Sequence, residues 1–255
     1  MSDTTDKSVI VTGAGSGIGE ATAKRFAREG WRVTLNGRTR DKLERVAAEI
    51  DAPDRTLIAA GDVSDHDDVD RVFAAHLDKF GRLDALINNA GVVVAGPIDE
   101  VAYEDWRQVM AINVDALYLT ISRAVPHLEK TNGSIVNVSS VSGIGGDWGM
   151  SPYNASKGAV SNFTRALALD LAARGIRVNA VAPSLTETDM TSGMLQDEDI
   201  LGTFRNRIPM GRPAAPEEVG DVIVFLTGHD ARFVNGVELP VDGGLSASNG
   251  QPNFR

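Results

Sequence analysis

Residues 12–19 read TGAGSGIG, and they join a short apolar, β-branched segment to an amphipathic one with a helical pattern. Gly13 and Gly17 lack side chains, so the backbone there can turn tightly and approach a pyrophosphate. Gly19 would let the helix pack closely on the strand, and the helix N-terminus offers N–H groups to phosphates. The glycines are spaced G-x-x-x-G-x-G rather than G-x-G-x-x-G. The order strand, turn, helix predicts a dinucleotide site, and the alternative is a glycine turn that only serves packing.

The rest of the chain alternates short β-branched segments with amphipathic ones. Several strand candidates are almost continuously apolar, as expected where helices cover both faces of a parallel sheet. The alternation predicts a single α/β domain over residues 1–255, with a Rossmann-type, doubly wound parallel sheet of about seven strands flanked by helices. The expected strands are 8–12, 32–35, 56–60, 85–88, 134–139, 177–182 and 237–241; the expected helices include 17–29, 40–50, 67–79, 106–129, 153–173 and 216–226.

The composition narrows the class of protein. The net charge of −10 argues against a partner made of nucleic acid or anionic lipid, because phosphates would repel the chain. The absence of cysteine excludes disulfides and thiol nucleophiles, and the four histidines lack the spacing of metal ligands, so no metal site is expected. The polar N-terminus and the lack of a long apolar run favour a soluble, cytoplasmic protein.

A tyrosine and a lysine four positions apart, Tyr153 and Lys157, fall on a predicted helix and therefore on one face of it. A free phenol has a pKa near ~10, and a cation within ~4–6 Å favours the phenolate and lowers that value. The pair therefore predicts a general acid and base. The alternative is a solvated surface pair, since this spacing also occurs by chance.

Four motifs give the chain a family resemblance. Residues 12–19 match TGxxxGxG, residues 88–91 read NNAG, residues 153–157 match YxxxK, and residues 241–244 read VDGG. In this order and spacing they resemble the short-chain dehydrogenase/reductase family over nearly the whole chain. The resemblance implies an NAD(P)-dependent alcohol dehydrogenase or carbonyl reductase, cytoplasmic, which forms a homotetramer.

The resemblance also implies the site residues. Tyr153 exchanges the proton, Lys157 supports it, Ser140 hydrogen-bonds the same substrate oxygen with Ser139 in support, and Asn113 holds a water in a proton relay to Lys157. The implied cofactor contacts, which include two of these residues, are Gly13, Ser16, Gly17, Ile18, Gly19, Arg38, Asp62, Val63, Asn89, Ala90, Gly91, Tyr153, Lys157, Pro183, Thr186 and Thr188.

The second strand bears on the choice between NAD and NADP. Residues 33–39 read VTLNGRT, with Gly37 where an NAD-type aspartate would accept the ribose 2′-OH. No carboxylate repels a 2′-phosphate there, and the guanidinium of Arg38 can clamp one. NADP is therefore favoured. The alternative is that Arg38 stacks on adenine or points to solvent while NAD is bound.

The substrate side is expected to lie in two segments. Residues 183–190 resemble the family's PGxxxT segment, with Ser184 and Thr186 as departures, and the long connection predicts a substrate lid at 184–215. Ser140, Tyr153, Trp148 and Met190 are the expected substrate contacts. Within the family, residues 145–149 and 241–252 are similar to those of meso-2,3-butanediol dehydrogenases (acetoin reductases), which implies small secondary alcohols, diols or hydroxyketones.

Other functions stay open at this point. Reductases of 3-oxoacyl thioesters, sugars or steroids share the family motifs. A nucleotide-binding sensor could keep the fold without turnover. A cofactor-independent lyase on this fold would replace the lysine and the glycine turn, and a sugar-nucleotide epimerase would need a longer chain with an added substrate domain.

Overall fold

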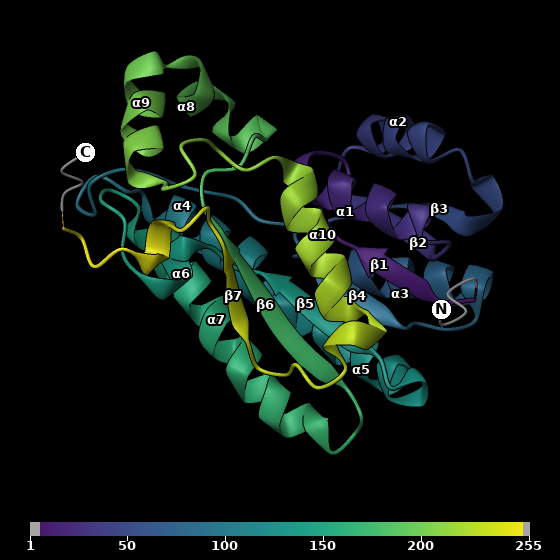
Figure 1. Ribbon diagram of the computed structural model, residues 1–255. Coiled ribbons are helices and arrows are strands. Elements are labelled where there is room, and N and C mark those ends of the chain that lie inside the picture. Colours follow the sequence, from purple (N-terminus) through teal and green to yellow (C-terminus); the bar gives the residue numbers. More distant parts are fainter. Residues whose placement is uncertain (1–5, 252–255) are drawn as a thin grey trace.

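A seven-stranded parallel sheet forms the centre of the computed structural model, which describes residues 6–251 (Figure 1). The strand order is β3-β2-β1-β4-β5-β6-β7, so the doubly wound sheet predicted from the sequence is confirmed. The order reverses direction at β1, where β1 pairs with both β2 and β4, and such a switch point opens a crevice at the carboxyl ends of the strands. The strands are β1 (Ser8–Val11), β2 (Arg32–Gly37), β3 (Thr56–Ala60), β4 (Ala85–Asn88), β5 (Ser134–Val138), β6 (Arg177–Pro183) and β7 (Glu238–Val241).

Helices cover both faces of the sheet, which explains why the strands are apolar at successive positions. Val9 and Val11 lie in one apolar core and Ile10 in the other, and all three are fully buried. The first core is shared with α1 (Gly17–Arg28), α2 (Arg40–Ile50) and α10 (Pro216–Thr227). The second is shared with α3 (His66–Phe80), α5 (Ala116–Thr131) and α7 (Ser151–Ala172). Figure 1 shows the two helical layers on either side of the strands.

The helix expected over 106–129 differs in the structure. It consists of α4 (Tyr103–Met110), a π-helical turn η2 (Ala111–Asp115) and α5. A π turn carries one residue more per turn than an α-helix and occurs frequently at functional sites. The turn differs from an α-helix in its backbone hydrogen bonding, which the sequence pattern did not reveal.

The segment after β6 folds over the carboxyl ends of the strands. It contains η3 (Asp189–Thr191), α8 (Ser192–Gln196) and α9 (Glu198–Arg207), and Figure 1 shows α8 and α9 standing apart from the two helical layers. A small apolar cluster of its own, Leu185, Leu201 and Ile208, holds this segment together. The remaining short elements are η1 (Pro53–Arg55), α6 (Val141–Ile144), η4 (His229–Ala231) and η5 (Leu245–Ala247).

Two further findings concern membranes and metals. Within residues 6–251, none of the helices combines the length and the apolarity that a membrane crossing requires. Over the same described range, no group of three or more His, Asp or Glu side chains is arranged to bind a metal ion.

Candidate active site

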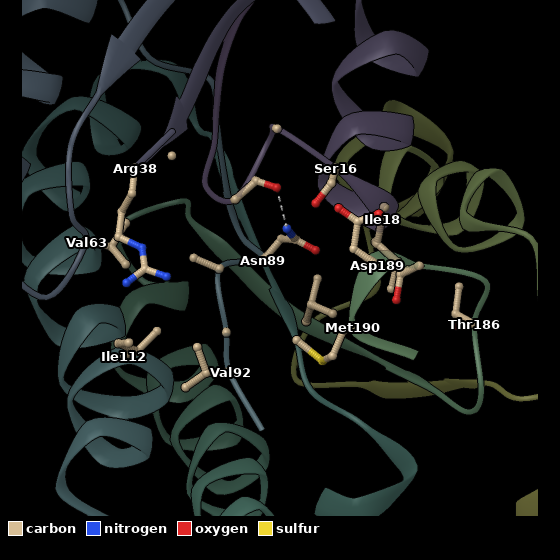
Figure 2. A pocket seen from close by; sticks show the side chains of 18 of the residues that line it. Ser16, Ile18, Arg38, Val63, Asn89, Val92, Ile112, Thr186, Asp189 and Met190 are labelled. Carbon is tan, nitrogen blue, oxygen red and sulfur yellow. Dashed lines mark hydrogen bonds between the residues drawn. The ribbon is translucent and has the colours of Figure 1, made fainter. Parts of the chain in front are cut away.

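A cavity of about 360 Å³ lies at the carboxyl ends of the strands, where the sheet changes direction. Its wall is formed by residues that follow β1, β2, β3, β4, β5 and β6. Figure 2 shows that Arg38 and Val63 lie toward one side of it, and that Thr186 and Met190 lie toward the other. The predicted crevice is therefore present and is built by six strand ends.

The glycine turn forms one wall, and it leaves no room for side chains. Gly13 and Gly17 have φ values of +64° and +54°, which side chains disfavour. A Cβ on Gly17 would lie 2.8 Å from Thr188 Cγ2, and a Cβ on Gly19 would lie 2.2 Å from the Gly13 carbonyl oxygen. The turn is a cradle that only glycine can form, and Gly19 serves it by close packing rather than by lining the cavity.

The segment after β4 fixes the glycine turn from the side. Asn89 Nδ2 donates to the carbonyl oxygens of Thr12 and Gly13, at 2.9 and 3.2 Å. Thr12 Oγ1 accepts the backbone N–H groups of Asn89 and Ala90, at 2.9 and 3.1 Å. Two motifs that lie 76 residues apart thus hold each other in place.

The predicted cofactor contacts come together with one exception. All of them line the cavity apart from Gly19. The cavity also contains two charged residues that the sequence did not suggest: Lys42 Nζ donates to Asp189 Oδ2 at 2.8 Å, which links α2 to η3. They are 147 positions apart, and no local pattern connects them. The crowded glycine turn, the free N-terminus of α1 and the length of the cavity fit a dinucleotide.

Lys157 and Tyr153 meet at the end of the cavity near β5. Lys157 is buried, its Nζ lies 5.6 Å from the centre of the Tyr153 ring, and it donates to the Val138 carbonyl oxygen at 2.8 Å. Burial lowers the pKa of Lys157 from 10.5 to about 8, so the ammonium form still predominates at neutral pH.

The pKa of Tyr153 differs from the sequence expectation. Burial raises it, a hydrogen bond with Ser140 lowers it, and the negative charge of Asp147 raises it, with a net upward shift. The expected lowering of this pKa depends on Lys157 together with the positive charge of a bound, oxidised nicotinamide; in the protein alone the apolar environment disfavours the phenolate.

The two adjacent serines after β5 have different surroundings. Ser139 Oγ bonds to Ser161 Oγ at 2.8 Å and to the Lys157 carbonyl oxygen at 3.3 Å, beneath α7. Ser140 is the N-cap of α6, and its Oγ accepts the Ser142 backbone N–H at 3.1 Å and donates to Ser142 Oγ at 3.1 Å. Both serines line the cavity, and only Ser140 is hydrogen-bonded to Tyr153.

Asn113 lies in the π turn and is almost fully buried. Its Oδ1 accepts the Val92 N–H at 2.8 Å, and its Nδ2 donates to the Val92 carbonyl oxygen and to Ser156 Oγ. A Cβ on Gly91 would lie 3.3 Å from Asn113 Oδ1 and 3.6 Å from Lys157 Nζ, so the two side chains border the same small space. Asn113 does not itself line the cavity.

Two further expected substrate contacts, Met190 and Trp148, differ in their position relative to the cavity. Met190 lines the cavity and is 49% exposed, while Trp148 lies outside its wall and is 97% exposed. The loop that carries Trp148 is tied to its surroundings through its backbone, since Gly96 N–H donates to the Gly149 carbonyl oxygen at 2.7 Å.

Comparison with known proteins places this geometry in a family. The family model described as "Enoyl-(Acyl carrier protein) reductase" matches residues 13–246. The chain is 48% identical to the meso-2,3-butanediol dehydrogenase of Serratia marcescens, over 98% of either protein. It is 43% identical to the glucose 1-dehydrogenase of Gluconobacter oxydans (strain 621H), over 94% of this chain and 92% of that protein.

A solved structure is similar to this chain over nearly its whole length. The 3-ketoacyl-(acyl-carrier-protein) reductase from Brucella melitensis, complexed with NADH, superposes with a TM-score of 0.88 at 37% identity, covering 94% of this chain and 98% of that one. Fold, motifs and relatives coincide over nearly the full length. The chain therefore belongs to the short-chain dehydrogenase/reductase family and is a nicotinamide-dependent oxidoreductase that interconverts secondary alcohols and ketones.

Proposed function

We propose that the enzyme interconverts small vicinal diols and hydroxyketones, such as 2,3-butanediol and acetoin, with Tyr153 as acid and base. The convergence of Ser140, Tyr153 and Lys157 at the end of the dinucleotide cavity carries the proposal of these roles. The 48% identity to a meso-2,3-butanediol dehydrogenase supports the substrate class.

The protein supplies the proton chemistry. Tyr153 takes the alcohol proton during oxidation and returns it to the carbonyl oxygen during reduction. Ser140 hydrogen-bonds the same substrate oxygen, and the buried ammonium of Lys157 stabilises the phenolate. Asn113 holds a water from which Lys157 is reprotonated. A nicotinamide bound in the cavity supplies the hydride acceptor or donor, and the protein positions it.

The choice of NADP over NAD is part of the proposal. Gly37 carries no carboxylate and Arg38 is exposed at the cavity wall, so its guanidinium is free to bind a 2′-phosphate. A Cβ on Gly37 meets only Leu43 Cδ2, at 3.4 Å, so a side chain is tolerated. Gly37→Asp should lower the ratio of kcat/KM for NADP to that for NAD at least about tenfold, or about 1.4 kcal/mol. Gly37→Ala controls for the added carbon, and an unchanged ratio in Gly37→Asp would contradict the assignment.

The segment 184–215 is proposed as the substrate lid, because it has its own apolar cluster and contributes Met190 to the cavity. A homotetramer is proposed as well. Large apolar side chains that remain exposed, among them Tyr118 on α5 and Leu169 on α7, support it. Light scattering of the purified protein measures its mass, and a monomer would contradict the tetramer.

The activity itself is tested by absorbance of the reduced nicotinamide, with NADP and NAD. Substrates are meso-2,3-butanediol, acetoin, glucose, a 3-hydroxysteroid and a 3-oxoacyl thioester. The highest kcat/KM is expected for the diol and the hydroxyketone. A preference for the sugar, the steroid or the thioester would replace the substrate class and leave the reaction class intact. No turnover of any substrate would favour a nucleotide-binding sensor instead.

A further inference from the structure

The loop 145–149, between α6 and α7, places a carboxylate beside the proposed proton-transfer site. Its backbone is anchored to α7: Asp147 N–H donates to Asn154 Oδ1 at 3.0 Å, and Asn154 Nδ2 donates to the Met150 carbonyl oxygen at 2.8 Å. Asn154 directly follows Tyr153 on the helix. The position of Asp147 is therefore set by the same helix that carries the tyrosine.

A chain of side-chain hydrogen bonds leads from Asp147 to the site. Ser142 Oγ donates to Asp147 Oδ2 in a short bond, and Ser142 Oγ is in turn 3.1 Å from Ser140 Oγ. An ionised carboxylate only accepts, so the one hydrogen of Ser142 must point to Asp147. Ser142 can then only accept from Ser140, so the direction of the chain is fixed.

This series of hydrogen bonds joins two buried hydroxyl groups to an exposed carboxylate. Ser142 is 5% exposed and Ser140 is 8% exposed, while Asp147 lies at the surface. Among residues 6–251 no cation forms an ion pair with Asp147, so its carboxylate remains a net negative charge next to the site. Tyr153 therefore has two charged groups nearby. One is the Asp147 carboxylate, and the other is the Lys157 ammonium, whose Nζ lies 5.6 Å from the centre of the Tyr153 ring.

We propose that Asp147 is a positioning residue, which through Ser142 holds the Ser140 oxygen in place beside Tyr153, so that the Ser140 hydrogen need only turn from Ser142 to the substrate oxygen when substrate binds. The proposal rests on the function proposed above and on the role of Ser140 in it. Ser140 is a cavity residue whose side-chain partners among the described residues are Ser142 and Tyr153, and without Ser142 its hydroxyl is freer to rotate. Asp147 also acts on Tyr153 through space, because its negative charge raises the pKa of the phenol.

Two variants separate the hydrogen bonds from the charge. Ser142→Ala breaks the chain and keeps the carboxylate; kcat should fall about fivefold, which corresponds to about 1 kcal/mol for one hydrogen bond. Asp147→Asn keeps a group that accepts from Ser142 and removes the charge. It should move the pH midpoint of alcohol oxidation to lower pH by roughly half a unit, the size expected for one partly solvated charge. Ser142→Ala should not move the midpoint in that direction.

Control variants distinguish a failure of the positioning role from a failure of the proposed function. Asp170→Asn removes an exposed carboxylate from α7 and should match the wild type. If Ser140→Ala retains full activity, the role proposed for Ser140 is wrong. If Ser140→Ala is inactive while Ser142→Ala and Asp147→Asn both match Asp170→Asn, the positioning role is wrong and the proposed function stands. Thermal unfolding is measured for each variant, and Asp147→Asn, at an exposed position, carries the test if Ser142→Ala is unstable.

Discussion

The two ends of the cavity are built by different means. At the dinucleotide end, shape comes from glycines without room for a Cβ, held by hydrogen bonds of the Thr12 and Asn89 side chains to backbone groups of residues 12–13 and 89–90. At the substrate end, shape comes from side chains on loops and short helices, and one of these, Met190, is 49% exposed. The first end suits a cofactor that does not change, and the second suits a substrate that differs between relatives with the same fold.

The largest expected effect lies where the two ends meet. Tyr153→Phe removes the hydroxyl proposed to exchange the proton and leaves the ring in place. The value of kcat should fall by about 10³-fold, within the range for general acid and base catalysis. Cofactor affinity, measured by fluorescence titration, should stay within about twofold of the wild type. Substantial residual turnover would contradict the role of Tyr153 in proton transfer.

A second variant tests the glycine turn at the dinucleotide end of the cavity. Gly19→Ala places a Cβ 2.2 Å from the Gly13 carbonyl oxygen, so the turn must shift. Dinucleotide affinity should fall by about 100-fold, and the protein should be destabilised by about 1–3 kcal/mol. Gly202→Ala, at a helical glycine with no atom near the added carbon, is the matched control. Normal cofactor binding in Gly19→Ala would contradict the claim that the glycine turn shapes this end.

A pH experiment examines the buried lysine between the two ends. The pKa of Lys157 is about 8 in the folded protein against 10.5 when exposed, so the unfolded chain binds more protons between these values. The free energy of unfolding of the cofactor-free protein should therefore rise with pH from about 8 to 10.5, by up to about 3 kcal/mol. Lys157→Met should lack this rise. Parallel curves for the two proteins in urea titrations would mean that burial does not perturb the lysine.

The smallest effect is expected at the substrate end. Trp148→Ala should change KM for the diol by about two- to fivefold and leave cofactor affinity unaltered, because the side chain lies outside the cavity wall. Phe233→Ala, at an equally exposed ring, is the matched control. A change in KM of two orders of magnitude would show that Trp148 contacts the substrate during turnover.

The sequence predicted the dinucleotide end far better than the substrate end. The strand 56–60 was predicted with its observed bounds and β2 within two residues, because continuous apolar runs and glycine turns are local signals. Where β2 extends, Asn36 and Gly37 pair with Ala59 and Ala60, a long-range effect that a local pattern does not contain. The gathering of the predicted cofactor contacts followed from the motifs.

What the sequence missed depends on contacts between distant residues or on burial. Lys42 and Asp189 meet only after folding, and the link from Asp147 to Ser140 requires the loop geometry of 145–149. The π turn was missed because it is a change in backbone hydrogen bonding that the pattern of side chains does not display. The upward shift of the Tyr153 pKa in the protein alone comes from burial, and the pattern of residues shows the neighbouring cation and not the loss of water.

The small apolar cluster of Leu185, Leu201 and Ile208 has a practical consequence. Because α9 packs around these residues rather than around the two cores beside the sheet, the segment is internally consolidated. Exchanging 184–215 for the equivalent stretch of a sugar- or steroid-specific relative thus moves most of this cluster as one unit, and the contacts to Gly243 and Leu245 are the ones that the recipient must match. The recipient keeps its central strands, and new specificities become accessible by recombination instead of by redesign of the whole enzyme.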